Sequence, residues 1–154
     1  MYLMNSKKET ATQMASMEKE HNKMVYERDM AQAQEQKFRD RLKALASADI
    51  KSFPLNGLGA HPEQKAIVHW NNKSGQVYLS INNLPAPPEG KQYQLWAIVD
   101  GKPVDAGMYD YDSNVDFWTM KVIAKAEMFA ITIEDLGGSP TPTMDQMVVA
   151  GKPI

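Results

Sequence analysis

The distribution of glycine and proline divides this chain of 154 residues near residue 48. Residues 1–48 contain neither residue type, whereas all nine glycines and all nine prolines come later. The first part is rich in Met, Ala, Gln, Glu and Lys, which are good helix formers. Because glycine and proline are what usually interrupt helices, we expect one long N-terminal α-helix over residues 1–48 and a separate domain over residues 49–154.

Apolar residues of the first part recur every seven positions, which is typical of a coiled-coil seam. A helix of this length extends roughly 65–70 Å at 1.5 Å per residue, too far to bury its own apolar residues. It therefore pairs with another copy over residues 5–47, packs on the second part or acts as a spacer. The seam carries Leu3, Met17, Met24, Ala31, Phe38 and Leu45, with Met14 and Leu42 on a partner line. That partner line is weakened by Lys7, His21, Arg28 and Glu35.

The second part alternates β-forming runs with turns. Asp100-Gly101 separates two such runs and predicts a hairpin whose turn residues both have positive φ. We expect about seven or eight strands with no helical pattern between them, which is typical of a mainly β protein and of an antiparallel β-sandwich. The runs that read as strands are 65–70, 75–82, 92–99, 102–109, 116–123, 127–134 and 145–151.

The run that contains Trp96 is apolar on both faces. Alternation puts Tyr93, Leu95 and Ala97 on one face, and Gln94 and Trp96 on the other. Strands of this kind lie centrally with both faces covered, so Trp96 is predicted to be a buried anchor. The helix, a loop or a partner chain would cover its second face.

Composition and motifs argue against an enzyme. The net charge of −2 disfavours nucleic-acid binding, and the lack of cysteine excludes thiol chemistry and disulfides. No two of the three histidines have metal-ligand spacing, and no serine-nucleophile or phosphate-binding motif occurs. We therefore predict no catalytic, metal or cofactor-binding residues. Asp105, Asp110, Asp112 and Asp116 cluster in sequence, but a calcium loop starting at Asp110 would lack its glycine and final glutamate.

Aromatic residues flank that acidic stretch and leave a binding module open as an alternative function. Tyr109, Tyr111, Phe117 and Trp118 could bind a ligand such as a carbohydrate, or they could belong to the core. By alternation Phe117 and Trp118 do not both point inward without a bulge. A cluster of exposed rings on one concave face would favour the binding module.

Residues of about 50–151 resemble the extracytoplasmic C-terminal domain of the anti-sigma-K factor (RskA-like) family. The order of a Leu-Pro loop, a Gly-Lys turn, a Tyr-Gln-Leu-Trp strand, an Asp-Gly hairpin and a GGSPTPT segment carries this resemblance. The signature residues, with a structural or partner-contacting role, are Tyr93, Gln94, Leu95, Trp96, Asp100, Gly101, Glu134, Gly137, Gly138, Ser139, Pro140, Thr141, Pro142 and Thr143.

The resemblance implies a role in transcription regulation and signal transduction. It implies the periplasmic domain of a single-pass, membrane-anchored anti-sigma factor in the bacterial inner membrane. A cytoplasmic domain, absent from this chain, would bind an extracytoplasmic-function sigma factor, and regulated proteolysis would release it. The membrane helix would precede Met1, so that residues 1–48 form the stalk. The GGSPTPT segment, stiffened by its prolines, would brace the sandwich or contact a protease or regulatory lipoprotein.

Overall fold

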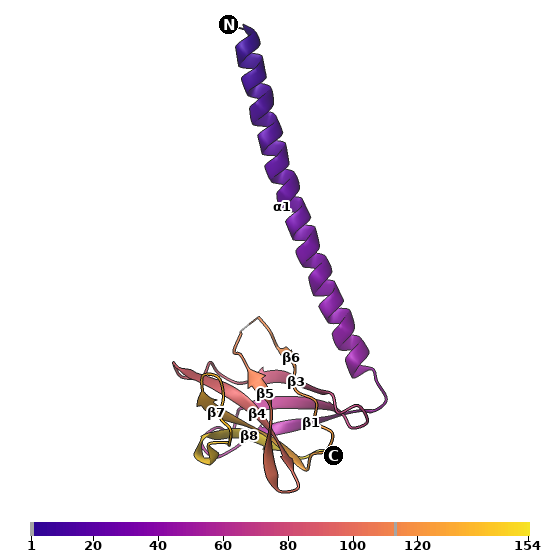
Figure 1. Cartoon of the computed structure of the whole chain (residues 1–154), viewed down its shortest axis with the longest axis vertical. Helices are drawn as coiled ribbons and strands as arrows, with labels where there is room; N and C mark the ends of the chain where they lie inside the picture. Colours follow the sequence, from indigo (N-terminus) through magenta and orange to yellow (C-terminus); the bar gives the residue numbers. More distant parts are fainter. Residues whose placement is uncertain (1, 113) are drawn as a thin grey trace. The chain divides into compact units, whose positions relative to one another are not determined.

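A computed structural model describes residues 2–112 and 114–154 (Figure 1). The chain forms two compact units that divide between Ala44 and Leu45. The first unit is a helix and the second is a β-sheet domain. The expectation of a long helix followed by a mainly β domain is confirmed.

Helix α1 spans Tyr2–Leu45 without interruption. Its surface is supported by pairs four residues apart, including Glu35 and Arg39, whose Oε1 and Nη2 atoms are 2.6 Å apart. The seam residues are exposed on this helix: Met14, Met17 and Phe38 have exposed fractions of 66, 70 and 59 %. Helix propensity and ion pairs between neighbouring turns therefore account for the helix. Its exposed apolar residues form a surface that another helix can bury.

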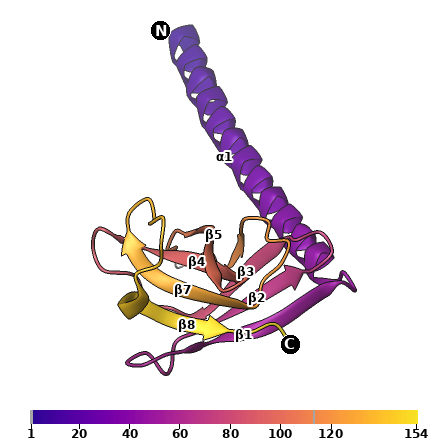
Figure 2. The same cartoon turned by 60° about the horizontal axis from the view of Figure 1, so that its bottom comes forward.

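The sheet domain consists of eight strands in a single antiparallel sheet, in the order β5-β4-β7-β8-β1-β2-β3-β6. Figure 2 shows how this sheet curls, from β1 and β8 round to β4 and β5. The mainly β fold class and the number of strands are thus confirmed. The strands are β1 (Ile50–Gly57), β2 (Lys65–Asn71), β3 (Val77–Asn83), β4 (Lys91–Val99), β5 (Lys102–Tyr109), β6 (Phe117–Thr119), β7 (Met128–Asp135) and β8 (Met147–Gly151).

Strand β1 is the one that the sequence patterns did not single out, because it contains Pro54. It pairs with β2 from Ile50 to Asn56, but with β8 only at Asn56 and Gly57. Pro54 therefore lies where the strand has a ladder partner on one side only, which is where a strand tolerates a residue without an N–H.

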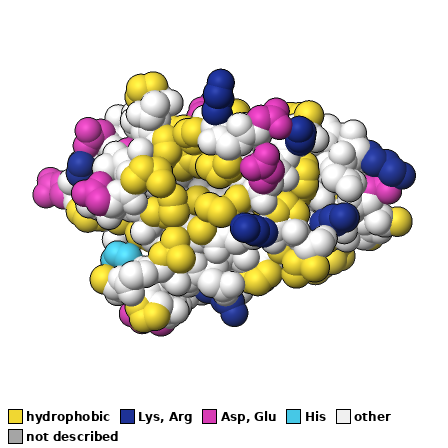
Figure 3. Space-filling model, turned by 90° about the horizontal axis from the view of Figure 1, so that it is seen from below, with side chains coloured by type: hydrophobic (Ala, Val, Ile, Leu, Met, Phe, Trp, Pro, Cys, Tyr) yellow, Lys and Arg dark blue, Asp and Glu magenta, His cyan; other side chains and the backbone are white. Residues whose placement is uncertain are grey.

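The sheet domain keeps several apolar side chains at its surface. Leu136, Met144 and Val122 have exposed fractions of 68, 67 and 63 %. Figure 3 shows one face, seen from below, with hydrophobic side chains gathered across its centre and charged side chains mostly around them.

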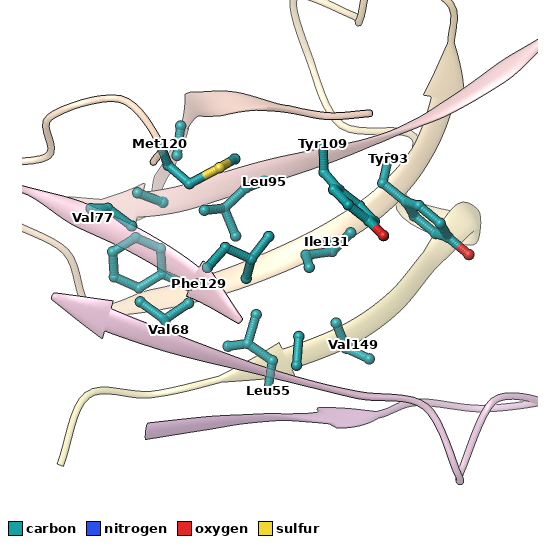
Figure 4. Packing of buried hydrophobic residues seen from close by; sticks show 14 of the residues in the cluster. Leu55, Val68, Val77, Tyr93, Leu95, Tyr109, Met120, Phe129, Ile131 and Val149 are labelled. Atoms are coloured by element: carbon teal, nitrogen blue, oxygen red, sulfur yellow. The ribbon is translucent and has the colours of Figure 1, made fainter. Parts of the chain in front are cut away.

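Apart from Trp96, the large buried apolar side chains point into the curl and form one core (Figure 4). Phe129 of β7 lies at its centre, with its ring centroid 5.7 Å from that of Phe53 and 5.8 Å from that of Trp70. Leu55, Leu79, Leu95, Ile131 and Val149 join these rings from five strands. Burial of these side chains is the main driving force for the curl.

The segment after β6 connects the two ends of the sheet. Met120 and Ile123 donate main-chain hydrogen bonds to Val77 and Gly75 at β3, over 2.9 and 2.7 Å. Between them, Lys121 donates to the carbonyl of Ala106 in β5, over 2.9 Å. Only β6 (Phe117–Thr119) of the expected 116–123 strand is regular, because the residues beyond it bridge two strands.

The predicted hairpin and the predicted anchor are both confirmed. Asp100 and Gly101 have φ values of 50° and 74°, as a tight two-residue turn requires. Strand β4 is paired on both sides, with β5 and β7, and Trp96 is 1 % exposed. Its indole N–H donates to Thr132 Oγ1 over 2.8 Å, on the face opposite to Leu95.

Truncation of this anchor tests how much it contributes to stability. We expect Trp96→Ala to lower the free energy of unfolding by roughly 3–5 kcal/mol, because a large buried side chain leaves a cavity. Trp96→Phe, which retains a ring but loses the indole N–H, should lose less. Urea unfolding followed by circular dichroism measures both, and an unchanged Trp96→Ala protein would contradict the anchoring role.

Candidate functional site

The signature residues of β4 lie on opposite faces of the sheet. Tyr93 and Leu95 belong to the core, whereas Gln94 and Trp96 lie on the outer face. Register pairs Gln94 with Thr132 of β7, and Gln92 with Glu134. These five outer-face residues, Gln92, Gln94, Trp96, Thr132 and Glu134, are all buried and are called the outer polar cluster.

Gln94 binds the GGSPTPT segment, residues 137–143, which we call the capping loop. Its Oε1 accepts the main-chain N–H of Ser139 over 2.8 Å, and its Nε2 donates to the carbonyl of Ser139 over 3.2 Å. Nε2 also donates to Asp105 Oδ1 over 3.0 Å. One side-chain amide thus supplies the main-chain partners that a loop without a strand neighbour lacks.

Gln92 makes a second contact of the same kind. Its Oε1 accepts the main-chain N–H of Gly137 over 3.1 Å, and its Nε2 donates to Asp110. Sequence reasoning did not include Gln92 among the candidate residues. The available signal was its place two residues before Gln94, which puts both amides on one face of the strand.

Glu134 holds the far end of the capping loop. Its Oε1 accepts the main-chain N–H of Thr143 over 2.7 Å, and its Oε2 accepts the Thr143 hydroxyl over 2.7 Å. Thr132 donates its hydroxyl to Glu134 Oε1 over 2.6 Å while it accepts the N–H of Trp96. Trp96, Thr132, Glu134 and Thr143 thus form a continuous chain of hydrogen bonds from the strand to the loop. Thr132 was also missed by the sequence analysis.

The electrostatics of the cluster favour an ionised Glu134. Burial alone would raise the pKa of this carboxyl, but the hydrogen bonds from Thr132 and Thr143 hold the pKa below its usual range. Asp105 is similar: burial raises its pKa, and Lys121, Gly107 and Gln94 together lower the pKa further than burial raises it. Both carboxylates therefore act as fixed acceptors at neutral pH.

The backbone conformation of the capping loop requires its two glycines. Gly137 and Gly138 have φ values of 93° and 87°, so the predicted use of positive φ is confirmed. A Cβ atom at Gly138 would lie 2.7 Å from Met108 Sδ and 3.1 Å from Gln94 Oε1. The loop therefore approaches the strand more closely than a side chain at residue 138 would permit.

Tertiary structure assembles only some of the signature residues. It brings Gln94, Trp96, Glu134, Gly138, Ser139 and Thr143 together at the outer polar cluster. Pro140 and Thr141 are exposed, and Pro142 is half-buried in the same loop. Asp100 and Gly101 form the hairpin turn instead, where Asp100 Oδ1 accepts a hydrogen bond from Lys125 Nζ over 2.7 Å.

The outer polar cluster has a structural role, because its side chains hold the capping loop against the sheet. The Glu134 carboxylate accepts hydrogen bonds from the hydroxyl groups of both Thr132 and Thr143, and the side chains of Thr132 and Glu134 are 0 and 3 % exposed. A substrate cannot reach either group while the capping loop is in place. The arrangement instead satisfies every polar atom that it buries, which fixes the shape of the loop.

The aromatic and acidic residues around 109–118 do not form an exposed platform of rings. Trp118 and Phe117 point to opposite faces, as alternation predicted: Trp118 packs edge-on against Tyr109 at 5.3 Å, and Phe117 stacks on Tyr78 at 5.4 Å. Tyr109 is buried and Tyr111 is 43 % exposed. Within residues 2–112 and 114–154, no group of three or more His, Asp or Glu side chains is placed to hold a metal ion.

Fold and cluster together define the class of this protein: a curled antiparallel sheet domain with a braced capping loop, preceded by one long helix. The model of the family described as "Anti-sigma-K factor rskA, C-terminal" matches residues 7–147, and the chain belongs to this family. The resemblance based on residues 50–151 is therefore confirmed, and the match also includes most of helix α1. This family consists of membrane-associated anti-sigma factors, which are regulators rather than enzymes.

Two further comparisons place the chain among known proteins. A Streptomyces griseus protein named "Uncharacterized protein in phr 5'region" is 33 % identical over 124 residues, which are 78 % of this chain and 50 % of that protein. The chain thus spans about half the length of this curated relative. No solved structure matches the chain. In the part of the chain that the structure describes, no helix is long and apolar enough to cross a membrane.

Replacement of the buried carboxylate tests the brace and its pH dependence. Because the folded-state pKa of Glu134 is lowered, its contribution to stability is present above the unfolded pKa and is lost as pH falls through the folded pKa. We expect Glu134→Gln to be less stable at neutral pH by roughly 1–3 kcal/mol, because hydrogen bonds to a charged acceptor are lost. Urea unfolding measures this difference, which should shrink as the pH is lowered below about 4.

The neighbouring residue provides a matched control for this prediction. Asp135 is 83 % exposed at its side chain and pairs with Lys91 at 2.6 Å. Asp135→Asn should change stability by less than about 1 kcal/mol, as exposed ion pairs contribute little. Equal losses in the two variants, or a Glu134→Gln difference that persists unchanged in acid, would contradict the role of the buried carboxylate.

Proposed function

We propose that this chain is the extracytoplasmic regulatory domain of a membrane-anchored anti-sigma factor, together with its stalk. The observation that carries the proposal is the family match over residues 7–147, which includes both the sheet domain and most of helix α1. The Streptomyces griseus relative is about twice as long as the matched region, which leaves room for further parts in a protein of this kind. A separate cytoplasmic domain would bind the sigma factor, and a single membrane helix would connect it to this chain.

In this proposal, regulated proteolysis outside and then within the membrane releases the sigma factor. The capping loop is the proposed contact for a regulatory protease or lipoprotein. It is held in one shape by Gln92, Gln94 and Glu134, and it is flanked by the exposed side chains of Leu136 and Met144. A preordered loop with apolar flanks loses little conformational entropy when a partner binds.

Transcription measurements in the native host test this function. Deletion of the gene should raise transcription from promoters that depend on the partner sigma factor, because the sequestering protein is lost. Return of the intact gene should restore repression. If no sigma-dependent set of transcripts responds to the deletion, the anti-sigma role is wrong.

We also propose that helix α1 associates with a second copy of itself. Its seam offers Met17, Met24 and Phe38, which are 70, 57 and 59 % exposed on the helix. Arg28 and Glu35 lie on the partner line, so association is modest and depends on concentration. Attachment of two copies to one membrane raises their effective concentration and favours the pair.

Analytical ultracentrifugation tests the helix pair with matched methionine variants. The whole chain should form dimers at high micromolar concentration, whereas a fragment of residues 49–154 should stay monomeric. Met24→Glu places a charge in the seam and should abolish the dimer; Met30→Glu, on another face of the helix, should not. A monomeric whole chain, or equal behaviour of the two variants, would exclude this association.

A further inference from the structure

The seam of helix α1 is interrupted by charged side chains, and these restrict how a second helix can pack on it. Met17 and Met24 are 70 and 57 % exposed on the seam. On the partner line, the side chains of Arg28 and Glu35 are 63 and 59 % exposed. In a coiled coil both lines enter the interface. The direction of the second helix therefore decides what each charged residue meets.

A parallel pair of aligned helices brings each residue opposite its own copy. Arg28 would then face Arg28 of the second copy, and Glu35 would face Glu35. Like charges that face each other across an interface repel, and the cost rises as water is excluded. The parallel pair is therefore disfavoured in its middle.

An antiparallel pair avoids these contacts in one register. Reversal of one helix exchanges the two lines, so that partner-line residues pack opposite seam residues of the second copy. Each polar residue then faces an uncharged one, and the small Ala31 leaves room for the long Arg28 stem. The facing residues are Arg28 and Ala31, Glu35 and Met24, His21 and Phe38, and Leu42 and Met17.

The charges beside the seam select the same register. Glu18 and Arg39 each follow directly after a seam residue, so they lie along the same edge of the helix. In the register described, Glu18 lies beside Arg39 of the second copy at both ends of the pair. On the other edge Glu20 lies beside Arg41 in the same way. A shift of one heptad toward the N-terminal end would instead set Glu27 beside Glu27, and a shift the other way would shorten the overlap.

Arg39 is able to serve two carboxylates. Its Nη2 is 2.6 Å from Glu35 Oε1 of its own helix, and its side chain is 69 % exposed. A guanidinium has five N–H donors, so a second carboxylate can bind without loss of the first. Because Arg41 also has an interaction within its own chain, Glu18 and Arg39 are the better-defined pair.

The two Arg28 side chains come near each other at the centre of this pair. Each has Glu35 of the other copy on its far side, about 6 Å along the axis at 1.5 Å per residue. Asp29 of its own helix also binds each guanidinium, with 3.0 Å between Nη2 and Oδ1. Carboxylates within reach of these long side chains therefore balance the charge at the centre.

We propose that helix α1 pairs antiparallel with a second copy, with Glu18 beside Arg39 of that copy. This rests on the helix association proposed above and adds its direction and register. Two copies held in one membrane by their N-terminal ends are restricted to the parallel pair, where a raised effective concentration has to outweigh the like-charge contacts. The antiparallel pair is the form of chains that proteolysis has freed from the membrane.

Distances between spin labels on two paired chains test the direction. The chain has no cysteine, so one introduced cysteine places a nitroxide at a single known position. With Thr12→Cys, pulsed electron paramagnetic resonance should give roughly 50 Å or more in the antiparallel register, against about 20 Å in a parallel pair. With Ala33→Cys, near the centre of the pair, it should give roughly 20–25 Å, which shows that the helices are paired.

Charge reversals test the register by ultracentrifugation. Glu18→Arg sets like charges side by side at both ends of the pair and should raise the Kd of the dimer roughly threefold to thirtyfold. Arg39→Glu should do the same, and the double variant should return the Kd toward that of the unmodified chain. In a parallel pair these residues lie about 30 Å apart along the axis, so no such rescue would occur. Circular dichroism confirms that each variant keeps its helix.

Asp40→Arg is the matched control, because it makes the same reversal of charge on the outer face of the helix. Its Kd should stay within about twofold of the unmodified chain. Short distances at both labels, or a double variant that is no better than the single variants, would overturn the antiparallel pair while the association itself stands. A chain that stays monomeric throughout would overturn both. None of these results alters the transcriptional test of the anti-sigma role.

Discussion

The pairing of β4 with β7 is the contact on which the rest of the sheet domain depends. The two strands are in register from Lys91 opposite Asp135 to Ile98 opposite Met128, and both faces of the pair are covered. On the inner face, Leu95 and Ile131 belong to the core. On the outer face, the same pairing sets Gln94 beside Thr132 and Gln92 beside Glu134. One ladder of main-chain hydrogen bonds therefore positions both the hydrophobic core and the outer polar cluster.

This arrangement explains how a proline- and glycine-rich loop is held in one shape. The capping loop has no neighbouring strand, so its main-chain groups need other partners. Two glutamine amides and one carboxylate provide them at Gly137, Ser139 and Thr143. Because these side chains are buried, loss of one leaves a desolvated group in the loop without a partner, which is costly. The shape of the loop is thus tied to the stability of the sheet beneath it.

The two polar regions of the sheet domain differ in how completely their groups are used. In the outer polar cluster, Thr132 and Glu134 bond to each other and to the loop, and the cluster is closed. The groove lined by Tyr109, Tyr111 and Asp112 is open instead, and Tyr111 is 43 % exposed there. The family match supports the regulatory context for both.

Local patterns in the sequence determined the helix, seven of the eight strands, the Asp100-Gly101 turn and the burial of Trp96. These features depend on propensity, alternation and turn chemistry within a few residues, so a single sequence contains them. Strand β1 was not predicted, because a proline usually argues against a strand. The structure tolerates Pro54 because β1 pairs there with one neighbouring strand only. The signature residues could be named from the resemblance, but their division between the outer polar cluster and the hairpin turn could not.

Tertiary structure alone decided what those residues contact. Gln92 and Gln94 are 45 positions away from Gly137 and Ser139, and Tyr109 lines one groove together with residues 81–84 because the sheet curls. Such contacts depend on strand order, register and the path of a loop over a face, and no local pattern encodes these. The sequence by itself therefore determined which segments form helix, strands and turns, and which family they resemble. The three-dimensional packing of distant strands decided which polar groups contact one another and are satisfied by the protein.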